Sequence, residues 1–115
     1  MSAGQVLQLD DESFDDEVFV GDEPVLVQFY SEDSYPCREL SDMLGRLASE
    51  FNGKVCIGRI DADENWQTAK TYSVTTVPCV LLFAKQRVVE RIEGPKTLEE
   101  YRQALNELVS EHWVI

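Results

Sequence analysis

Residues 29–38 read Phe29-Tyr30-Ser31-Glu32-Asp33-Ser34-Tyr35-Pro36-Cys37-Arg38 and join two segments of different pattern. The segment before them, Val25–Tyr30, is apolar except for Gln28, which is typical of a central strand covered on both faces. The segment after them has apolar residues at helical spacing: Leu40, Met43, Leu44, Leu47, Ala48 and Phe51. Ser34 and Cys37 therefore lie where a buried strand ends and a helix begins. Functional groups are usually placed at this point of an open α/β sheet, and the positive end of a helix favours a thiolate.

These residues resemble the active site of the thioredoxin family, which reads Phe-Trp-Ala-Glu-Trp-Cys-Gly-Pro-Cys-Lys. The resemblance continues without a gap along the chain. Arg59–Asn65 resembles the family's segment after its third strand, Val74–Pro78 resembles its cis-proline segment, and Gly94 matches a glycine before its last helix. The resemblance implies a single thioredoxin-like domain over residues 1–115. It also implies an α/β thioredoxin fold, with a central mixed sheet of about five strands flanked by about four helices.

The chain departs from the family pattern around the motif. Ser34 stands where the family has its first cysteine, and Tyr35 stands where it has glycine. Asp33 replaces a tryptophan, and Gln28 replaces the buried acid of the preceding strand. Glutamine has no titratable proton, so it cannot perform the proton exchange with the second cysteine that the resemblance implies for an acid. We expect Gln28 to be a core amide with hydrogen-bond partners, because an unpaired buried amide costs a few kcal/mol.

Composition narrows the function classes. The chain has 115 residues and a formal net charge of -12, with a pI near 4.3. Such an acidic chain is a poor ligand for nucleic acid or for anionic membrane surfaces. The N-terminus lacks the basic start and apolar core of a signal peptide, no apolar run reaches membrane-spanning length, and the three cysteines do not form a secreted disulfide pattern. We therefore expect a cytoplasmic monomer.

The spacing of apolar residues, together with turn and capping residues, predicts the order of the helices and strands. The patterns predict strands over residues 6–9, 25–30, 54–60, 80–83 and 88–92, and helices over residues 11–20, 36–51, 65–72 and from 98 onward. Asn52-Gly53 is a helix stop, Lys85-Gln86 a hairpin turn, and Thr97-Leu98-Glu99-Glu100 a capping box that opens the last helix. Asn65 is a candidate N-cap.

Other polar and sulfur-bearing residues have structural interpretations. Cys56 is expected to be a small buried hydrophobic residue. Asp61, Asp63 and Glu64 follow a strand, where acidic runs are usually solvated, and they have neither EF-hand spacing nor a nearby histidine. We therefore expect no metal site and no cofactor.

The motif cannot support the dithiol chemistry that the resemblance implies. In that chemistry one thiolate attacks a substrate disulfide and a second thiol resolves the mixed disulfide. Ser34 is a poor substitute for the first thiol, because a hydroxyl is far less acidic and no base is evident beside it. Cys37 matches the second, shielded cysteine. We expect little or no disulfide reductase activity.

Three functions remain open. In the first, the domain binds a protein or peptide through Tyr35, Pro36, Val77 and Pro78, with Trp66 beside them, and the acidic residues before Ser34 favour a basic partner. In the second, Cys37 acts as a single thiol that forms a mixed disulfide or is glutathionylated. In the third, the protein is an active thioredoxin in which Ser34 is an engineered replacement of cysteine; the further departures from the motif favour natural divergence.

Cys79 directly follows Pro78, at a position where the family often has threonine. The resemblance places this loop against the motif, so Cys79 is a possible second thiol for Cys37. A disulfide would require Cα atoms about 4.4–6.8 Å apart. We favour a core role instead, because Cys79 begins an apolar strand and free cysteines are usually buried.

Overall fold

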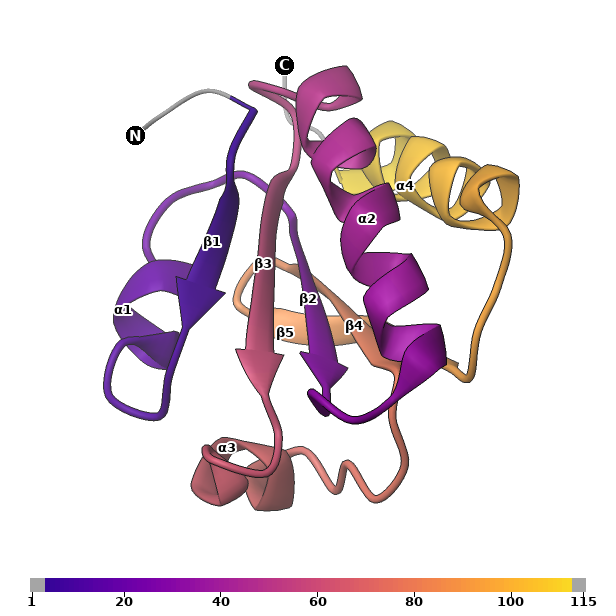
Figure 1. Ribbon diagram of the computed structural model, residues 1–115. Coiled ribbons are helices and arrows are strands. Elements are labelled where there is room, and N and C mark those ends of the chain that lie inside the picture. Colours follow the sequence, from indigo (N-terminus) through magenta and orange to yellow (C-terminus); the bar gives the residue numbers. More distant parts are fainter. Residues whose placement is uncertain (1–3, 113–115) are drawn as a thin grey trace.

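The central sheet follows from the apolar strand patterns. A computed structural model of the protein describes residues 4–112, with strands β1 (Val6–Leu9), β2 (Val25–Tyr30), β3 (Cys56–Asp61), β4 (Cys79–Ala84) and β5 (Arg87–Glu93). The strands pair in the order β1-β3-β2-β4-β5 (Figure 1). β1, β3 and β2 are mutually parallel, while β4 and β5 are antiparallel to their neighbours. The mixed sheet expected from the sequence is confirmed.

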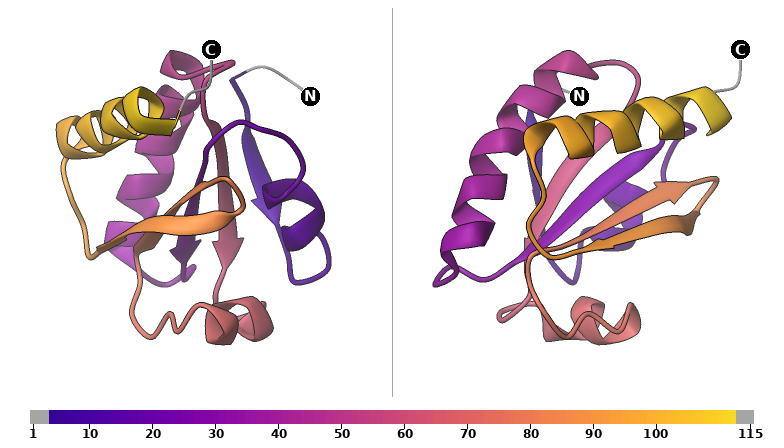
Figure 2. Two further views of the ribbon diagram at one scale, coloured as in Figure 1. Left: turned by 180° about the vertical axis from the view of Figure 1, so that it is seen from behind. Right: turned by 90° about the vertical axis from the view of Figure 1, so that its right-hand side faces the viewer.

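Helices cover both faces of the sheet (Figure 2). They are α1 (Phe14–Val18), α2 (Tyr35–Glu50), α3 (Trp66–Thr71) and α4 (Leu98–His112). One buried cluster joins α2 and α4 to the sheet, and a second joins α1 and α3 to the opposite face. Strand β2 is buried at every position because both of its faces are covered. The fold is the α/β thioredoxin fold.

The topology brings two separate segments to one edge of the sheet. Because β1, β3 and β2 are parallel, their carboxyl ends share this edge, where β2 leads into α2 and β3 leads into α3 (Figure 1). Strand β4 starts at the same edge, since its first residue, Cys79, pairs with Phe29 near the end of β2. The start of α2 and the loop before β4 are therefore neighbours.

The predicted bounds of two elements were wrong, and local hydrogen bonds explain where each of these elements begins. The helix predicted over residues 11–20 is only Phe14–Val18, because Asp10 and Ser13 bind each other's backbone N–H groups with their side-chain oxygens and form a turn. The strand predicted from residue 54 begins at Cys56, because the N–H groups of Lys54 and Val55 bind the Phe51 carbonyl in the turn that ends α2.

The residues predicted to end a helix, form a hairpin turn and open the last helix do so in the structure. Gly53 has φ +82° in the turn after α2, a conformation that glycine adopts without penalty. Lys85 and Gln86 both have positive φ, as a two-residue type I′ hairpin requires. Thr97 and Glu100 exchange side-chain bonds with each other's backbone N–H at 3.1 and 3.0 Å, which completes the predicted capping box. Asn65 precedes α3 but does not cap it with its side chain, which binds Asp11 N–H and the Asp61 carbonyl instead.

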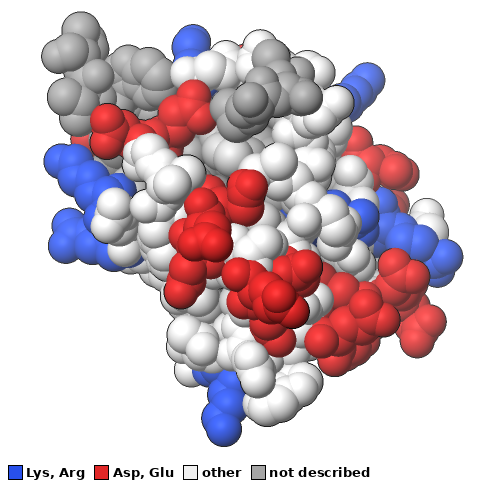
Figure 3. All heavy atoms as spheres, turned by 90° about the vertical axis from the view of Figure 1, so that its left-hand side faces the viewer, with Lys and Arg blue, Asp and Glu red and all other residues white. Residues whose placement is uncertain are grey.

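Acidic side chains are prominent on one face of the molecule (Figure 3). They gather on the side of the molecule that carries β1 and α1 (Figure 3), including the exposed Asp15, Asp16 and Glu17 of α1. Acids in the first turn suit the positive end of a helix. Within residues 4–112, none of the helices combines the length and the apolar composition needed to cross a membrane.

Candidate functional site

Ser34 is the N-cap of α2. Its backbone is extended, with φ −92° and ψ 120°, and its Oγ accepts the N–H of Cys37 at 3.3 Å. This satisfies one of the N–H groups that the first turn of a helix leaves without a backbone partner. Pro36 lies in the same turn, where its missing N–H is not needed. The residue that the resemblance matches to the nucleophile therefore has a structural contact to Cys37.

Cys37 is enclosed, with 1% of its surface exposed. Its carbonyl accepts a hydrogen bond from Nε2 of Gln28 at 3.1 Å, and Oγ of Ser41 donates to Oε1 of Gln28 at 3.3 Å. Gln28 is fully buried, so these bonds supply the partners that a core amide needs. The prediction that Gln28 is a satisfied core residue is confirmed, and Gln28 fixes the start of α2 to β2.

The loop before β4 lies at the same edge and is held from both ends. The Val77–Pro78 peptide bond is cis, and the Pro78 carbonyl accepts the N–H of Gly94 at 2.9 Å. At the other end, the guanidinium of Arg91 donates to the carbonyl oxygens of Tyr72 at 2.6 Å and Ser73 at 2.7 Å. Sequence reasoning did not identify Arg91, because its partners are main-chain atoms.

The three cysteines are free and differ in burial. Cys79 is fully buried at the start of β4, and this burial raises the pKa of its thiol. Cys56, expected to be buried, is only half-buried, because it begins β3 beside a surface hollow that Glu23 and Glu17 also line. Its pKa is raised by burial and, to a lesser extent, by these two carboxylates. Cys79 is a core residue, as favoured from the sequence.

Two large aromatic side chains are exposed at this edge. Tyr35, the first residue of α2, is 65% exposed, and Trp66, the first residue of α3, is 59% exposed. Val77 is half-buried and Pro78 is buried. Exposed aromatic residues are more often found at binding surfaces than on the rest of a protein surface.

A hollow of about 210 Å³ lies beside Cys37. Its walls come from the end of β2, the β2–α2 loop, the start of α2 and one residue of β3: Tyr30, Ser31, Glu32, Cys37, Arg38, Ser41 and Arg59. Sequence reasoning missed Arg59 as a neighbour of the motif. The signal was present, because Arg59 is a charged residue inside a strand and its parallel register places it opposite Gln28.

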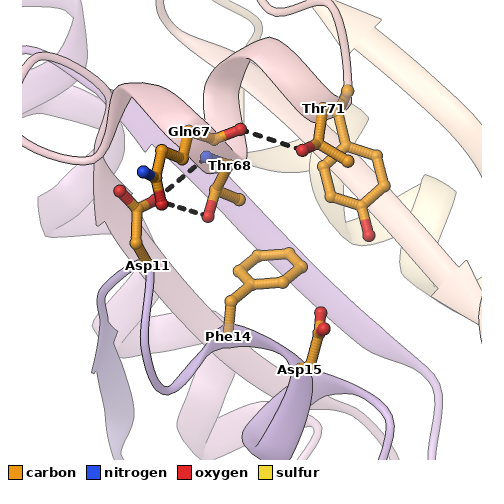
Figure 4. Close-up of a pocket in the computed structure, with 7 residues that line it drawn as sticks. Asp11, Phe14, Asp15, Gln67, Thr68 and Thr71 are labelled. Carbon is orange, nitrogen blue, oxygen red and sulfur yellow. Dashed lines mark hydrogen bonds between the residues drawn. The ribbon is translucent and has the colours of Figure 1, made fainter.

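A second hollow, of about 190 Å³, lies between α1 and α3. Figure 4 shows that Asp11 points toward Thr68, and Oδ1 of Asp11 accepts both the N–H of Thr68 at 2.9 Å and its hydroxyl at 2.6 Å. The Phe14 ring lines the hollow beside these two residues (Figure 4). Asp11 therefore joins the turn before α1 to α3.

The acidic run after β3 has a partly structural role. Asp61 was expected to be solvated but is only 8% exposed, and its Oδ1 accepts the N–H groups of Asp63 at 2.9 Å and Glu64 at 3.2 Å. These bonds stabilise the turn that leads into α3. In the described part of the chain, no group of three or more His, Cys, Asp or Glu side chains is arranged to hold a metal ion.

Comparison with known proteins agrees with this geometry. A family model for thioredoxin matches residues 5–107. The chain is 38% identical over 101 residues to a thioredoxin of Chlamydia pneumoniae, covering 88% of this chain and 92% of that protein. It is 33% identical over 92 residues to thioredoxin 1 of a Nostoc species, covering 78% of this chain and 86% of that one.

A solved structure extends the agreement to three dimensions. A mutant thioredoxin from Halobacterium salinarum, with glutamine in place of one asparagine, superimposes with a TM-score of 0.83 at 28% sequence identity, covering 100% of this chain and 96% of that one. The match of the family model to nearly the whole chain, together with these relatives, shows that the protein belongs to the thioredoxin family.

Proposed function

We propose that this thioredoxin-family protein is a protein-binding module with weak or no dithiol disulfide reductase activity. The observation that carries the proposal is the hydrogen bonding of the Ser34 hydroxyl. Within residues 4–112, the only hydrogen-bond partner of its hydroxyl is the Cys37 N–H, so no neighbouring base removes the hydroxyl proton. A neutral serine does not attack disulfides, and Cys37 is enclosed behind it.

The binding surface that we propose consists of Tyr35, Pro36, Val77 and Pro78, with Trp66 at its border. Support comes from the exposure of both aromatic side chains and from their position at the edge where α2, α3 and the proline loop begin or end. Glu32 and Asp33 are exposed beside it, which favours a basic peptide segment by charge complementarity. We include in the proposal a monomer and a cytoplasmic location, the latter supported by the three free cysteines.

Matched variants test the binding surface. Partners captured by the wild type would be measured again with Tyr35→Ala and Trp66→Ala, with Val20→Ala as control, since Val20 is 68% exposed but lies before β2, away from this edge. Truncation of an aromatic anchor should weaken the binding of a specific partner at least about fivefold, which corresponds to the loss of about 1 kcal/mol. Equal effects of all three variants would contradict the proposed surface.

A single-thiol function of Cys37 is the second candidate, and one observation favours it: the residue borders the hollow described above. In this reaction the Cys37 thiolate attacks a disulfide R–S–S–R′, forming Cys37–S–S–R and releasing R′–S⁻. Partner capture with wild type and Cys37→Ala, with and without reductant, separates the candidates. Capture that needs Cys37 and is lost in reductant supports the single thiol, and capture indifferent to both supports the binding module.

A further inference from the structure

The hollow beside Cys37 contains an arginine with an unusual set of partners. The guanidinium of Arg59 stacks on the Tyr30 ring, with 4.0 Å between Cζ and the ring centroid, and its Nη1 donates to Oε1 of Gln8 at 3.2 Å. Its Nε is buried and has no hydrogen-bond partner. In the part of the chain that the structure describes, no carboxylate lies within 4.0 Å of this guanidinium. The Nε–H of Arg59 is thus a buried donor without a partner, which is costly.

The lack of a carboxylate partner matters at Arg59 because its Nε is buried. The protein has 10 basic residues, and the described ion pairs involve only Arg91 and Arg102 among them. Arg102 shows the paired arrangement, because its guanidinium binds both Glu50 and Glu99. Arg59 instead faces Gln28 on the neighbouring strand, which is neutral and uses its amide on α2.

A second unpaired arginine lines the same hollow. Arg38 is exposed on the first turn of α2 and, among residues 4–112, it too has no carboxylate within 4.0 Å. Glu32 is the one acidic residue of the lining, so the charges of the wall sum to +1 in a protein of net charge -12. The hydroxyl of Ser41 already donates to Gln28 and that of Ser31 to Asp63. The free donors of the hollow therefore belong to the two arginines.

We propose that this hollow binds a small organic carboxylate. The planar fork of a guanidinium matches a carboxylate through paired N–H···O bonds. A singly charged ligand fits better than phosphate, because Glu32 and the net charge of the protein oppose a dianion. Tyr30 and the Cys37 side chain supply an apolar wall for the rest of the ligand. This inference does not depend on the proposed protein-binding role, because the hollow is not lined by Tyr35, Pro36, Val77 or Pro78.

The direct test is an NMR titration of the full-length protein with sodium acetate, at constant pH and with sodium chloride adjusted to keep the ionic strength fixed. The Nε–H resonance of Arg59 should shift along a saturating curve with a Kd of about 1–10 mM, as expected for one guanidinium–carboxylate site in water. Inorganic phosphate, titrated in parallel, should bind more weakly. Tighter binding of phosphate would overturn the assignment to a carboxylate, and a shift that grows linearly with acetate would overturn the site.

Charge-matched variants locate the site. Arg38→Gln should weaken acetate binding about threefold or more, and Arg59→Gln about tenfold, because each removes charged hydrogen-bond donors. Arg87→Gln is the control, because Arg87 is exposed at the start of β5 and loses the same charge outside the hollow. Glu32→Gln should tighten binding. If Arg87→Gln weakens binding as much as Arg38→Gln does, the effect is general electrostatics and the proposal fails. Arg38 is exposed, so this comparison holds even if Arg59→Gln impairs folding.

Discussion

The hydroxyl of Ser34 and the amide of Gln28 both contact Cys37, one at its N–H and the other at its carbonyl. The resemblance matches each residue to a position where thioredoxins carry a chemically active group, and in this structure each side chain forms a structural bond. The serine hydroxyl that caps the helix and the glutamine amide that joins the strand to it are both uncharged at neutral pH. At the residue scale, these two bonds support our proposal that the motif lacks the groups that start and assist disulfide exchange.

Restoring these groups should restore activity in two steps. Ser34→Cys should produce measurable disulfide reduction, because the helix N-terminus and the proline loop remain in place, but the rate should stay below that of an ordinary thioredoxin. Adding Gln28→Asp should raise the rate again, by up to about 10²-fold, because a buried acid can exchange protons with Cys37. A double variant no faster than Ser34→Cys alone would contradict this role for position 28.

The structural role of Gln28 predicts a loss of stability. Gln28→Leu removes the amide that donates to the Cys37 carbonyl and accepts from the Ser41 hydroxyl, and the loss of such buried bonds costs about 1–3 kcal/mol of unfolding free energy. Urea denaturation measures this change. Gln103→Leu is the matched control, because Gln103 is exposed on α4, and it should change stability by less than about 0.5 kcal/mol.

At the scale of elements, apolar periodicity was a reliable guide where burial is complete. β2 has its predicted bounds because every one of its residues is buried. The start of α1 was not predictable in this way, because it depends on which side chains bind the local backbone, as Asp10 and Ser13 do. The same limit applies to the site. The resemblance located Ser34 and Cys37, whereas Arg59 comes to line the hollow beside Cys37 through the register of β3 against β2.

The capping box of α4 gives a prediction with a pH dependence. Thr97→Ala should lower the unfolding free energy by about 1 kcal/mol at pH 7, because it removes the side-chain bond to the Glu100 N–H. Bonds from the backbone and side chain of Thr97 lower the pKa of Glu100 below 4.5. Because the pKa of Glu100 is lower in the folded state than in the unfolded state, its ionised carboxylate stabilises the fold at pH values above the unfolded-state pKa. The contribution of this carboxylate should therefore be lost as the pH falls below about 4.5.

Two measurements check the capping box. Urea denaturation of Thr97→Ala at pH 7 gives the stability change, and an NMR titration of Glu100 in the same variant should show its pKa closer to the ordinary value. Ser110→Ala is the control, because Ser110 lies near the end of the same helix, outside the capping box. If both variants destabilise equally, the capping bonds are not the cause.

At the scale of the whole molecule, the two helical layers determine which thiols reagents can reach. Cys37 is enclosed on the side of α2, and Cys79 belongs to the cluster that α1 and α3 cover. Cys56 is the partial exception at the start of β3, where the cover is incomplete. Alkylation of the two enclosed thiols requires the layers to open, whereas Cys56 is reachable in the folded protein.

Iodoacetamide should therefore modify Cys56 first and Cys37 and Cys79 only under conditions that unfold the protein, as mapped by mass spectrometry of peptides. The raised pKa of Cys56 predicts that its reaction accelerates as the pH rises, because more thiolate forms. After mild oxidation, the folded protein should still contain three free thiols. A mapped Cys37–Cys79 disulfide would contradict the core role of Cys79.

The central claim is that this thioredoxin-family protein does not catalyse dithiol disulfide reduction, because Ser34 replaces the attacking thiol. Insulin reduction with dithiothreitol as electron donor tests it most directly, with Cys37→Ala as the matched control. We predict that the wild type, like Cys37→Ala, reduces insulin no faster than dithiothreitol alone. Sustained turnover by the wild type that disappears in Cys37→Ala would contradict the account.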